Sequence, residues 1–306
     1  MHPAISVILF TVTSGAGFGA VALIGAGYPL SDNPVFFFLT ALVAGALAVI
    51  GLASSTFHLG HPERAWRAFS QWRSSWLSRE GVASVIALTL FGIFVLARLF
   101  TDLPTQGLGW AVSAFSIATV FTTSMIYAQL RTVPHWHSWL TPAVYLAFSL
   151  ASGFLLVAAA GKASALGEIP VALIAMLILL IAWALKIVWW QRAAGASLAS
   201  RGMTSGSATG LGKIGEVRLL ERPHTGGNYL TREMVHQIGR KHAAKLRFIA
   251  LVIGAALPVV IAAAVAWWEF ATPVLGLAFV AMLAGLFVER WLFFAEAKHS
   301  VSLYYE

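Results

Sequence analysis

The sequence predicts an all-α, polytopic integral membrane protein with eight transmembrane helices. Of its 306 residues, 59% are hydrophobic and only 10% are charged, and the mean hydropathy is +0.80. Soluble domains usually carry about 25% charged residues. So large an apolar fraction cannot be buried inside a 32.8 kDa globule, but a lipid bilayer can cover it.

Eight apolar stretches are long enough to cross a bilayer, whose core of about 30 Å requires roughly 20 apolar residues per helix. They cover about 4–27, 35–57, 81–100, 107–128, 141–161, 169–190, 247–268 and 272–294. The first follows no basic segment and ends in no cleavage site, so we expect it to remain as a membrane span. Within it, Gly15 and Gly19 form a Gly-x-x-x-Gly pair, which favours close approach of another helix.

Basic residues gather on one side of the predicted bundle. Eight spans place both termini on the same side, here called end A, together with loops 58–80, 129–140 and 191–246. The 58–80 loop alone holds four arginines, whereas the opposite side, end B, shows only Arg98 and Lys162. Because cytoplasmic loops are rich in Lys and Arg, the sequence predicts that end A is cytoplasmic (N-in/C-in) in a bacterial inner membrane.

The chain is expected to form a single transmembrane anchor domain, 1–306, with one sizeable cytoplasmic loop, 193–246. This loop opens with a Gly/Ser/Ala-rich stretch, 195–215, and ends in a charged, helix-like run, 232–247. It is too short and too polar to form a core of its own. Docking of a partner and contact with lipid headgroups are both open as its role.

Charge and cysteine content exclude some classes of function. The formal net charge is +8, but the basic residues lie in loops between apolar runs, which favours anionic headgroups over nucleic acid as their counterpart. The chain has no cysteine. It therefore cannot hold an iron–sulfur cluster by thiolate ligation, and any such centre must lie on a partner subunit.

The densest polar cluster lies at end A, between the second and third spans. His58 ends one apolar stretch and Glu80 begins the next, so the two are expected to meet at the same depth. Imidazole titrates near neutrality, and a carboxyl group at the membrane edge can exchange protons with water, so the pair fits the two protons of quinone reduction or quinol oxidation. Ionisable groups at membrane depth are costly, which favours a functional interpretation.

The same residues also have purely structural interpretations, which the sequence leaves open. Glu80 in a first helical turn is favoured by the helix dipole alone. His58 would also be satisfied by a hydrogen bond to a neighbouring backbone, and Arg64 and Arg79 would serve as topology signals only.

Two further polar segments at end A also have both a functional and a structural interpretation. The segment that begins at Tyr127 and runs to Trp136 either lines the same pocket or forms an ordinary interface belt. Glu289 and Arg290, inside the end A part of the last span, are expected to satisfy each other. All nine histidines lie at end A or its edge, which argues against a transmembrane haem ladder with histidines at two depths.

At these residues the chain resembles the membrane-anchor subunits of dimethyl sulfoxide reductase. The resemblance spans nearly the whole length, and its local matches are Phe57-His58-Leu59-Gly60-x-Pro62 with Arg64-Ala65, Leu77-Ser78-Arg79-Glu80, Tyr127 with Thr132-Val133-Pro134 and Thr141-Pro142, and, more weakly, Arg290 to His299. It implies an anchor that binds a quinol close to an iron–sulfur subunit, which exchanges electrons with a molybdopterin catalytic subunit. The family's quinol-site histidine and glutamate fall on His58 and Glu80.

The predicted orientation favours a related group. Dimethyl sulfoxide reductase anchors carry their partners on the outer face, whereas here the corresponding end is predicted to be cytoplasmic. The protein is therefore more similar to the anchor of the cytoplasmic sulfite-oxidising (sulfite dehydrogenase) complexes, also through the segment 222–233.

The resemblance thus implies an oxidoreductase subunit that passes electrons from sulfite oxidation to ubiquinone or menaquinone and holds no metal itself. His58 and Glu80 would be catalytic, and Arg64, Arg79 and Tyr127 would help to bind the quinone. The alternatives are a quinol-oxidising anchor of a dimethyl sulfoxide reductase-type complex, a haem b anchor, and a transporter. A transporter would need polar residues near mid-membrane or paired broken helices, and neither is evident in the sequence.

Overall fold

The computed structural model describes residues 4–28, 33–161, 164–165, 169–221, 223–224, 226, 242–268 and 270–305, without the side chains of His58, Ser164 and Ala165. Within them, eight helices are long and apolar enough to cross a membrane. They cover Ile5–Gly25, Pro34–Phe57, Trp76–Phe100, Gln106–Ala128, Leu140–Ala159, Val171–Gly195, Ala243–Trp267 and Thr272–Ala295. The predicted all-α, eight-span class is confirmed.

The main difference from the predicted boundaries concerns the third span. Helix α4 covers Trp76–Phe100, and the Ser75 side chain caps its start by accepting a hydrogen bond from the Ser78 amide. The expectation that Glu80 would begin this helix is therefore wrong, because Glu80 is the fifth residue and lies just past the first turn. A search for apolar residues misses a first turn that contains serine and arginine.

Two spans contain a π-helical segment. The first consists of α1 (Ile5–Leu9), η1 (Phe10–Ser14) and α2 (Gly15–Gly25), and the seventh of α10 (Ala243–Leu251), η7 (Val252–Ala256) and α11 (Leu257–Trp267). In the seventh, Pro258 has no amide hydrogen to donate four residues back to Gly254. Trp183 Nε1 donates a hydrogen bond to that Gly254 carbonyl instead, at 2.8 Å, which ties the seventh span to the sixth.

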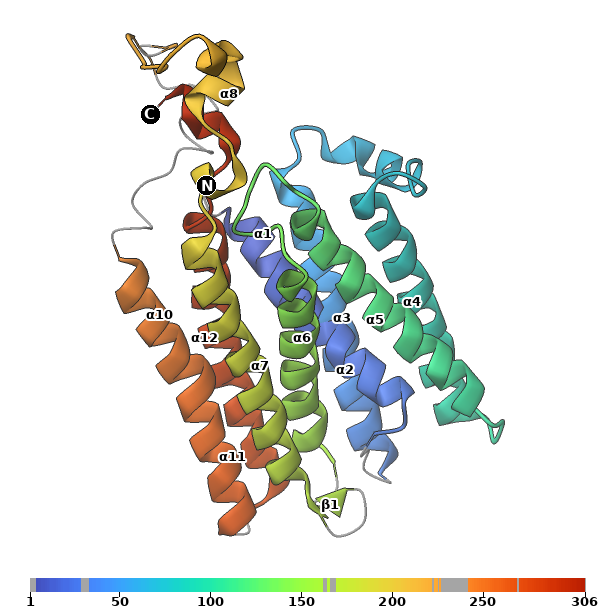
Figure 1. The fold of residues 1–306 in the computed structure, drawn as a ribbon. Helices are drawn as coiled ribbons and strands as arrows, with labels where there is room; N and C mark the ends of the chain where they lie inside the picture. Colours follow the sequence, from blue (N-terminus) through green and yellow to red (C-terminus); the bar gives the residue numbers. More distant parts are fainter. Residues whose placement is uncertain are drawn as a thin grey trace.

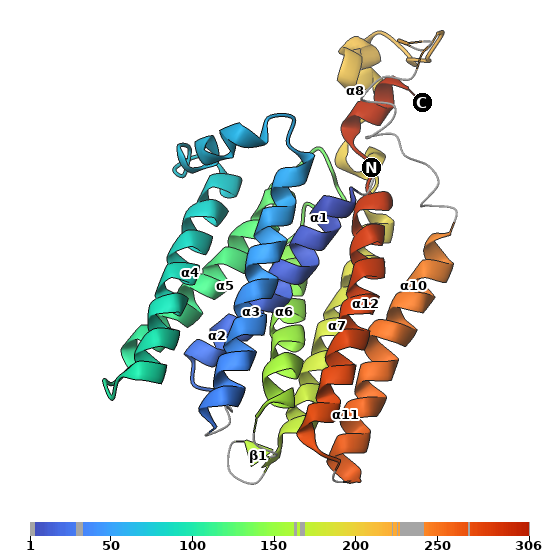
Figure 2. The same cartoon turned by 180° about the vertical axis from the view of Figure 1, so that it is seen from behind.

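The helices form a bundle with its two outer edges far apart in sequence (Figures 1 and 2). One edge holds α4 and α5, and the opposite edge holds α10 and α11, with α2, α6, α7 and α12 between them. The ranges of the helices not yet given are α3 Pro34–Ser54, α5 Gln106–Ala128, α6 Leu140–Ala159, α7 Val171–Gly195 and α12 Leu275–Ala295.

Small residues allow α2 and α6 to approach closely in the centre. A Cβ atom on Gly19 would collide with the backbone of Ser149, and one on Gly153 would collide with the backbone of Gly19 and Ala20. Gly15, the other member of the predicted pair, has nothing within 4 Å of the same position. Gly19 thus allows the close approach of the two backbones, whereas Gly15 contributes its carbonyl oxygen, which accepts a hydrogen bond of 2.6 Å from the Ser149 hydroxyl.

End A carries most of the structure outside the spans. The short helices η2 (Ser55–His58) and η3 (Pro62–Phe69) follow α3, while η4 (Ala199–Arg201), α8 (Ser205–Thr209) and η5 (Leu211–Lys213) follow α7. Helix α8 lies beside the C-terminal η9 (Ser300–Tyr304), where the Tyr304 hydroxyl donates to the Ala208 carbonyl at 3.0 Å. At end B, a two-residue strand β1 (Ser164–Ala165) pairs antiparallel with β2 (Ile169–Pro170), and η8 (Thr272–Val274) precedes α12.

Two sequence features lie largely outside the described residues. Of the helix-like run 232–247, only 242–247 is described, and α10 begins within it at Ala243. Of the segment 222–233, only Pro223, His224 and Gly226 are described, and His224 Nδ1 lies 3.1 Å from the Tyr305 hydroxyl.

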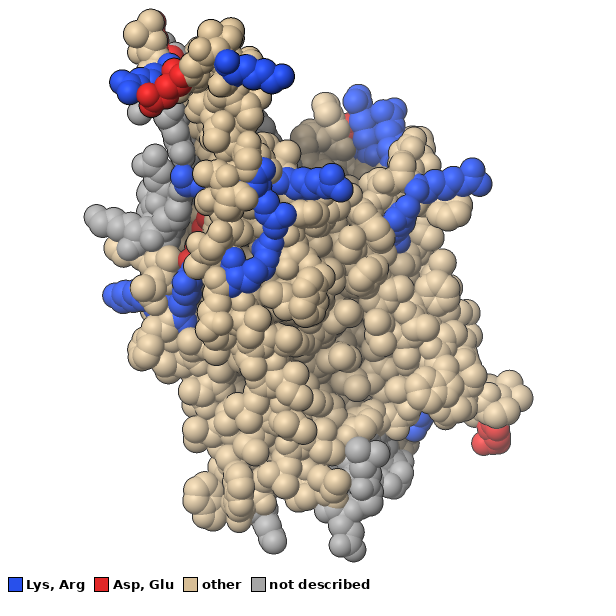
Figure 3. Space-filling view, viewed as in Figure 1, with Lys and Arg blue, Asp and Glu red and all other residues tan. Residues whose placement is uncertain are grey.

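Figure 3 shows that Lys and Arg side chains gather at end A. Among the described residues, the basic side chain at end B is Arg98, whose guanidinium lies 4.8 Å from the centre of the Phe37 ring. Between the ends, the outward faces of the spans are apolar, with Leu42, Ile50 and Leu177 more than half exposed. An apolar belt with charge at one end is the surface of a protein that spans a bilayer.

Candidate functional site

Glu80 lies inside the bundle, near end A. At 1.5 Å per residue it sits about 6 Å along the axis from the start of α4. Its side chain points to α5, where the Thr123 hydroxyl donates a hydrogen bond of 2.8 Å to Glu80 Oε1. Only 4% of Glu80 is exposed. Burying a carboxyl group here costs solvation free energy. Among the described side chains, Thr123 is the one that offsets this cost with a hydrogen bond to Glu80.

Two tyrosines follow the hydrogen-bonded pair of Glu80 and Thr123. Tyr127 lies one turn after Thr123 on α5, and Tyr145 faces it from α6. Their rings stack on each other, with centroids 6.0 Å apart at 28°. The predicted residue Tyr127 therefore lies at the same site as Glu80, and Tyr145 joins it from a third helix.

An aromatic cluster fixes the two tyrosines. Trp136, in the loop between α5 and α6, meets Tyr127 edge-on at 5.4 Å and stacks on Phe293 at 5.3 Å. Its indole nitrogen donates to the Phe293 carbonyl at 2.8 Å. Interlocked rings of this kind restrict side-chain rotation, so the tyrosine hydroxyls have defined positions.

A cluster of buried charges lies on the far side of Tyr145. The Arg290 guanidinium lies 4.0 Å from the centre of the Tyr145 ring, and its Nε lies 3.6 Å from Glu289 Oε2. Glu289 also forms an ion pair with Lys186 of α7. We call Lys186, Glu289 and Arg290 the buried charge cluster; their exposed fractions are 1%, 0% and 3%. With all three ionised, it holds two positive charges and one negative charge.

The cluster continues to the surface at end A. Glu296, the C-cap of α12, interacts electrostatically with Lys186, and its Oε1 accepts a hydrogen bond of 2.7 Å from Arg247 Nη2. Burial raises the pKa of Glu296, an effect that Arg247 and Lys186 oppose. Glu296, which is 8% exposed, is thus a buried carboxyl group that holds a proton more readily than an exposed one.

The remaining predicted site residues lie in the 58–80 loop and at its junction with α4. His58 is the last residue of η2, and its side chain lies outside the described part of the structure. Arg64 is exposed on η3, with its Nε 3.6 Å from Glu63 Oε1. Arg79 turns away from Glu80: it donates to the carbonyls of Trp72 at 3.0 Å and Arg73 at 2.7 Å. Arg79 therefore ties the loop to α4.

The same loop places aromatic side chains at the membrane edge next to Glu80. Phe69 packs against α4, where a Cβ atom on Gly81 would lie 3.2 Å from Phe69 Cε1. Trp66 and Trp72 of the loop are 66% and 53% exposed, and Phe57, just before the loop, is 81% exposed. Exposed aromatic rings at a membrane boundary match the depth of lipid headgroups and of a lipid-soluble ligand entering from the bilayer.

Thr123, Tyr145 and the contact between Lys186 and Glu289 were not predicted from the sequence. A signal for the last was present, because Lys186 and Glu289 each lie close to the end A side of an apolar span. Opposite charges at equal depth in two spans are expected to meet, since leaving either one in lipid is costly. The predicted pairing of Glu289 with Arg290 holds in part, with Lys186 as an additional partner.

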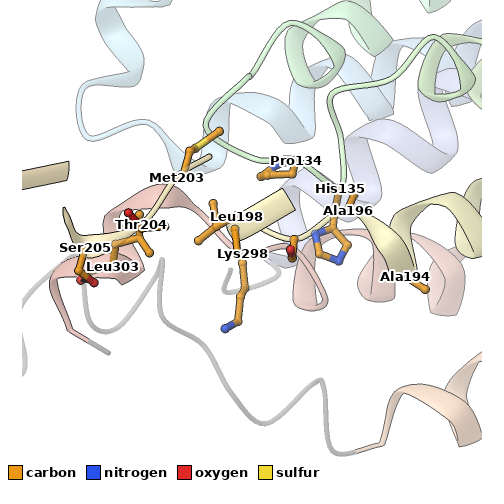
Figure 4. A pocket seen from close by; sticks show the side chains of 12 residues that line it. Pro134, His135, Ala194, Ala196, Leu198, Met203, Thr204, Ser205, Lys298 and Leu303 are labelled. Atoms are coloured by element: carbon orange, nitrogen blue, oxygen red, sulfur yellow. Dashed lines mark hydrogen bonds between the residues drawn. The ribbon is translucent and has the colours of Figure 1, made fainter. Parts of the chain in front are cut away.

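A separate hollow of about 450 Å³ opens at end A (Figure 4). His135 and Lys298 contribute to its wall beside apolar side chains such as Leu198, Met203 and Leu303. Of the predicted quinone residues whose side chains the structure describes, Arg64, Arg79, Glu80 and Tyr127, none lines it. The Glu80 site and this hollow are therefore distinct features of the same end.

Fold and site together define an integral membrane protein with a buried cluster of ionisable side chains near one face. The family model for "DMSO reductase anchor subunit (DmsC)" matches residues 1–295. The protein belongs to this family.

Comparison with individual proteins supports the same family. The sequence is 34% identical to the C subunit of sulfite dehydrogenase from Allochromatium vinosum, in an alignment that covers all of this protein and 99% of the relative. It is 29% identical to YnfH, an anaerobic dimethyl sulfoxide reductase chain of Escherichia coli, over 56% of this protein and 63% of the relative. It is also 31% identical to the C component of anaerobic dimethyl sulfoxide reductase from the same organism, over 37% of this protein and 42% of the relative. These relatives are parts of oxidoreductase complexes, and the resemblance predicted from the sequence is confirmed.

Proposed function

We propose that this chain is the quinone-reactive subunit of a molybdenum-containing oxidoreductase and passes electrons from sulfite oxidation to the membrane quinone pool. The observation that carries the proposal is the buried Glu80 carboxyl group, which is hydrogen-bonded to Thr123 beside two tyrosines, one turn inside the membrane edge. The full-length match to a sulfite dehydrogenase subunit supports the substrate of the partner.

The residues present fit a quinone. Its ring would be bound by apolar and aromatic side chains, and its two oxygens by donors, which Glu80 and His58 supply from adjacent spans. When bound, the quinone accepts two electrons and two protons. Glu80, buried inside the bundle near end A, would supply one of these protons from its carboxyl group. Arg64 adds positive charge at the membrane surface, which favours an acidic partner.

The partners are proposed to be an iron–sulfur electron-transfer subunit and a molybdopterin catalytic subunit, docked at end A. A protein without cysteine offers no thiolate ligand for the relay, so the cluster that delivers electrons must be theirs. The excess of Lys and Arg at end A supports a cytoplasmic location for this face in the bacterial inner membrane (Figure 3).

The test uses the assembled complex in membranes or mild detergent. Glu80→Gln and His58→Gln are expected to lower sulfite-to-quinone turnover by about 100-fold or more, the usual effect of removing a general acid or base. Sulfite-to-dye activity of the partners is expected to be unchanged. Glu216→Gln is the matched control, because Glu216 is an exposed end A carboxyl group paired with Arg218. Wild-type quinone turnover in both the Glu80 and His58 variants would refute the proposal.

A second candidate is the reverse direction, quinol oxidation for a dimethyl sulfoxide reductase. The partial matches to dimethyl sulfoxide reductase anchors favour it. Copurification decides between them: the catalytic partner retained in mild detergent will either oxidise sulfite or reduce dimethyl sulfoxide.

A further inference from the structure

We propose that Tyr145, Glu289 and Lys186 form a proton path across the bundle that connects Glu80 with Glu296 at the end A surface. This inference rests on the proposed function, because it assigns a proton supply to the same site. The proposed path consists of buried ionisable groups. A protein that only anchored partners would not require them, since apolar side chains would hold the helices together at a lower cost in desolvation free energy.

The first step of the path joins Glu80 to the buried charge cluster. Glu80 is 4% exposed, so its exchange with bulk water is restricted. Tyr145 lies between the two: its ring stacks on Tyr127, one turn after the Thr123 that holds Glu80, and the Arg290 guanidinium of α12 lies 4.0 Å from its centre. The buried Tyr145 hydroxyl makes no hydrogen bond of good geometry with the described residues, which leaves it able to bind a bridging water. A phenol hydroxyl can accept a proton on one lone pair while it donates its own, so it passes a proton on without a change in net charge.

The second step crosses from α12 to α7. Glu289 and Lys186 are in direct contact, and a carboxylate beside an ammonium group is a pair between which one proton can move. Arg290 stays protonated at all accessible pH values, so it acts as a fixed charge that keeps Glu289 paired when Lys186 has released its proton. Neither Glu289 oxygen accepts a hydrogen bond of good geometry from the described residues, which leaves both able to bind a bridging water.

The third step reaches the surface. The Lys186 ammonium and the Arg247 guanidinium lie 5.2 and 5.5 Å from the centre of the same Trp190 ring. Arg247, which is 35% exposed, donates a hydrogen bond of 2.7 Å to Glu296 Oε1. Burial raises the pKa of Glu296, so this group is suited to collect a proton from water.

Each transfer conserves protons and charge. Glu296 takes a proton from water, Lys186 and Glu289 hand it to Tyr145, and Tyr145 gives its own proton to Glu80 as it receives the new one. Glu80 thereby regains the proton that it has released at the quinone site. The electrons arrive separately, from the iron–sulfur partner.

The test measures proton uptake directly. In a single anaerobic turnover of the assembled complex, a pH-indicator dye reports uptake, and quenching of a fluorescent quinone analogue reports binding. Reduced methyl viologen supplies the electrons, because it releases no protons, whereas oxidation of sulfite to sulfate would release the same two protons that quinone reduction takes up. Tyr145→Phe removes one oxygen and keeps the stacked ring and its contact with Arg290. We expect uptake and quinone-linked turnover to fall about tenfold with analogue binding unchanged. Tyr304→Phe, a tyrosine at the end A surface, is the matched control.

Two further variants separate proton transfer from charge. Lys186→Met leaves Glu289 paired with Arg290, so the complex is expected to assemble, and Lys186→Arg keeps the charge without a releasable proton. Both are expected to slow uptake about tenfold, whereas the exposed control Lys213→Met is expected to have no effect. Wild-type uptake in Tyr145→Phe and Lys186→Met, or full recovery in Lys186→Arg, overturns the path.

The outcome for Glu80→Gln distinguishes the two proposals. Loss of quinone turnover in Glu80→Gln with normal uptake in Tyr145→Phe and Lys186→Met rejects the path and keeps the quinone site. Normal turnover in both Glu80→Gln and His58→Gln rejects the site itself.

Discussion

Lys186 on α7 and Glu289 on α12 form an ion pair inside the bundle, where 1% and 0% of their side chains are exposed. The Lys186 ammonium also lies 3.7 Å from the centre of the Trp189 ring, and the Trp189 indole donates to the Thr141 hydroxyl at 3.0 Å. Charges removed from water must be compensated by contacts of this kind. The pair therefore connects the sixth and eighth spans at the depth of the Glu80 site.

The ion pair predicts unequal effects of its two partners on stability. Glu289→Gln removes the carboxylate that is in direct contact with both Lys186 and Arg290, whereas Lys186→Met leaves the pair of Glu289 and Arg290. We expect Glu289→Gln to cost about 3–5 kcal/mol, the range for breaking a buried pair, and Lys186→Met to cost less. Thermal unfolding of the purified protein in mild detergent measures both. Equal losses would show that Arg290 does not compensate Glu289.

The contact between α2 and α6 predicts opposite outcomes for two nearby glycines. Gly19→Ala places a methyl group against the backbone of Ser149, which we expect to cost about 1–3 kcal/mol through overpacking. Gly15→Ala meets nothing within 4 Å and is expected to be neutral or to stabilise the helix by up to about 1 kcal/mol. The melting temperatures of the two variants in the same detergent test this, and a loss at both positions would contradict the packing.

The C-terminal segment is expected to loosen in acid. His299 Nδ1 accepts a hydrogen bond from the Val301 amide at the start of η9, and burial lowers the pKa of His299 below its usual 6.5. The unfolded segment therefore binds a proton more readily than the folded one, so stability is complete above about pH 6.5 and is lost as the pH falls through the folded pKa.

Protection of the Val301 amide from hydrogen exchange, measured from about pH 7.5 to about pH 5, should fall roughly fivefold, which corresponds to the loss of about 1 kcal/mol of cap stability. His299→Asn keeps a capping acceptor that does not titrate in this range. The same acid-induced loss in that variant would exclude His299 as the cause.

Single cysteines report the orientation without background, because the protein has none of its own. Lys213→Cys lies at end A and Asp102→Cys at end B, and both positions are exposed. In intact spheroplasts, a membrane-impermeant thiol reagent is expected to label Asp102→Cys and to leave Lys213→Cys unlabelled. Inside-out vesicles should show the reverse, and labelling of Lys213→Cys in spheroplasts would place end A outside.

Two features predicted from the sequence were the number of spans and the gathering of charge at one end. Both follow from free energies that depend on composition along the chain: the transfer of apolar residues into lipid, and the attraction of basic loops to anionic lipid. The same pattern predicts that Glu80 lies near the end A boundary. It places Glu80 at the start of the third span, whereas α4 begins four residues earlier, at Trp76.

The partners of Glu80 and Lys186 were decided only by the tertiary structure. Hydropathy gives the depth of a residue in the membrane but not the direction in which its side chain points around the helix axis. That direction depends on close contacts such as Gly19 against Ser149, which set how each helix is rotated and which neighbours it meets. Tyr145 of α6 thus meets both Tyr127 of α5 and Arg290 of α12 because three helices pack with these faces together, and no pattern within a single span contains that information.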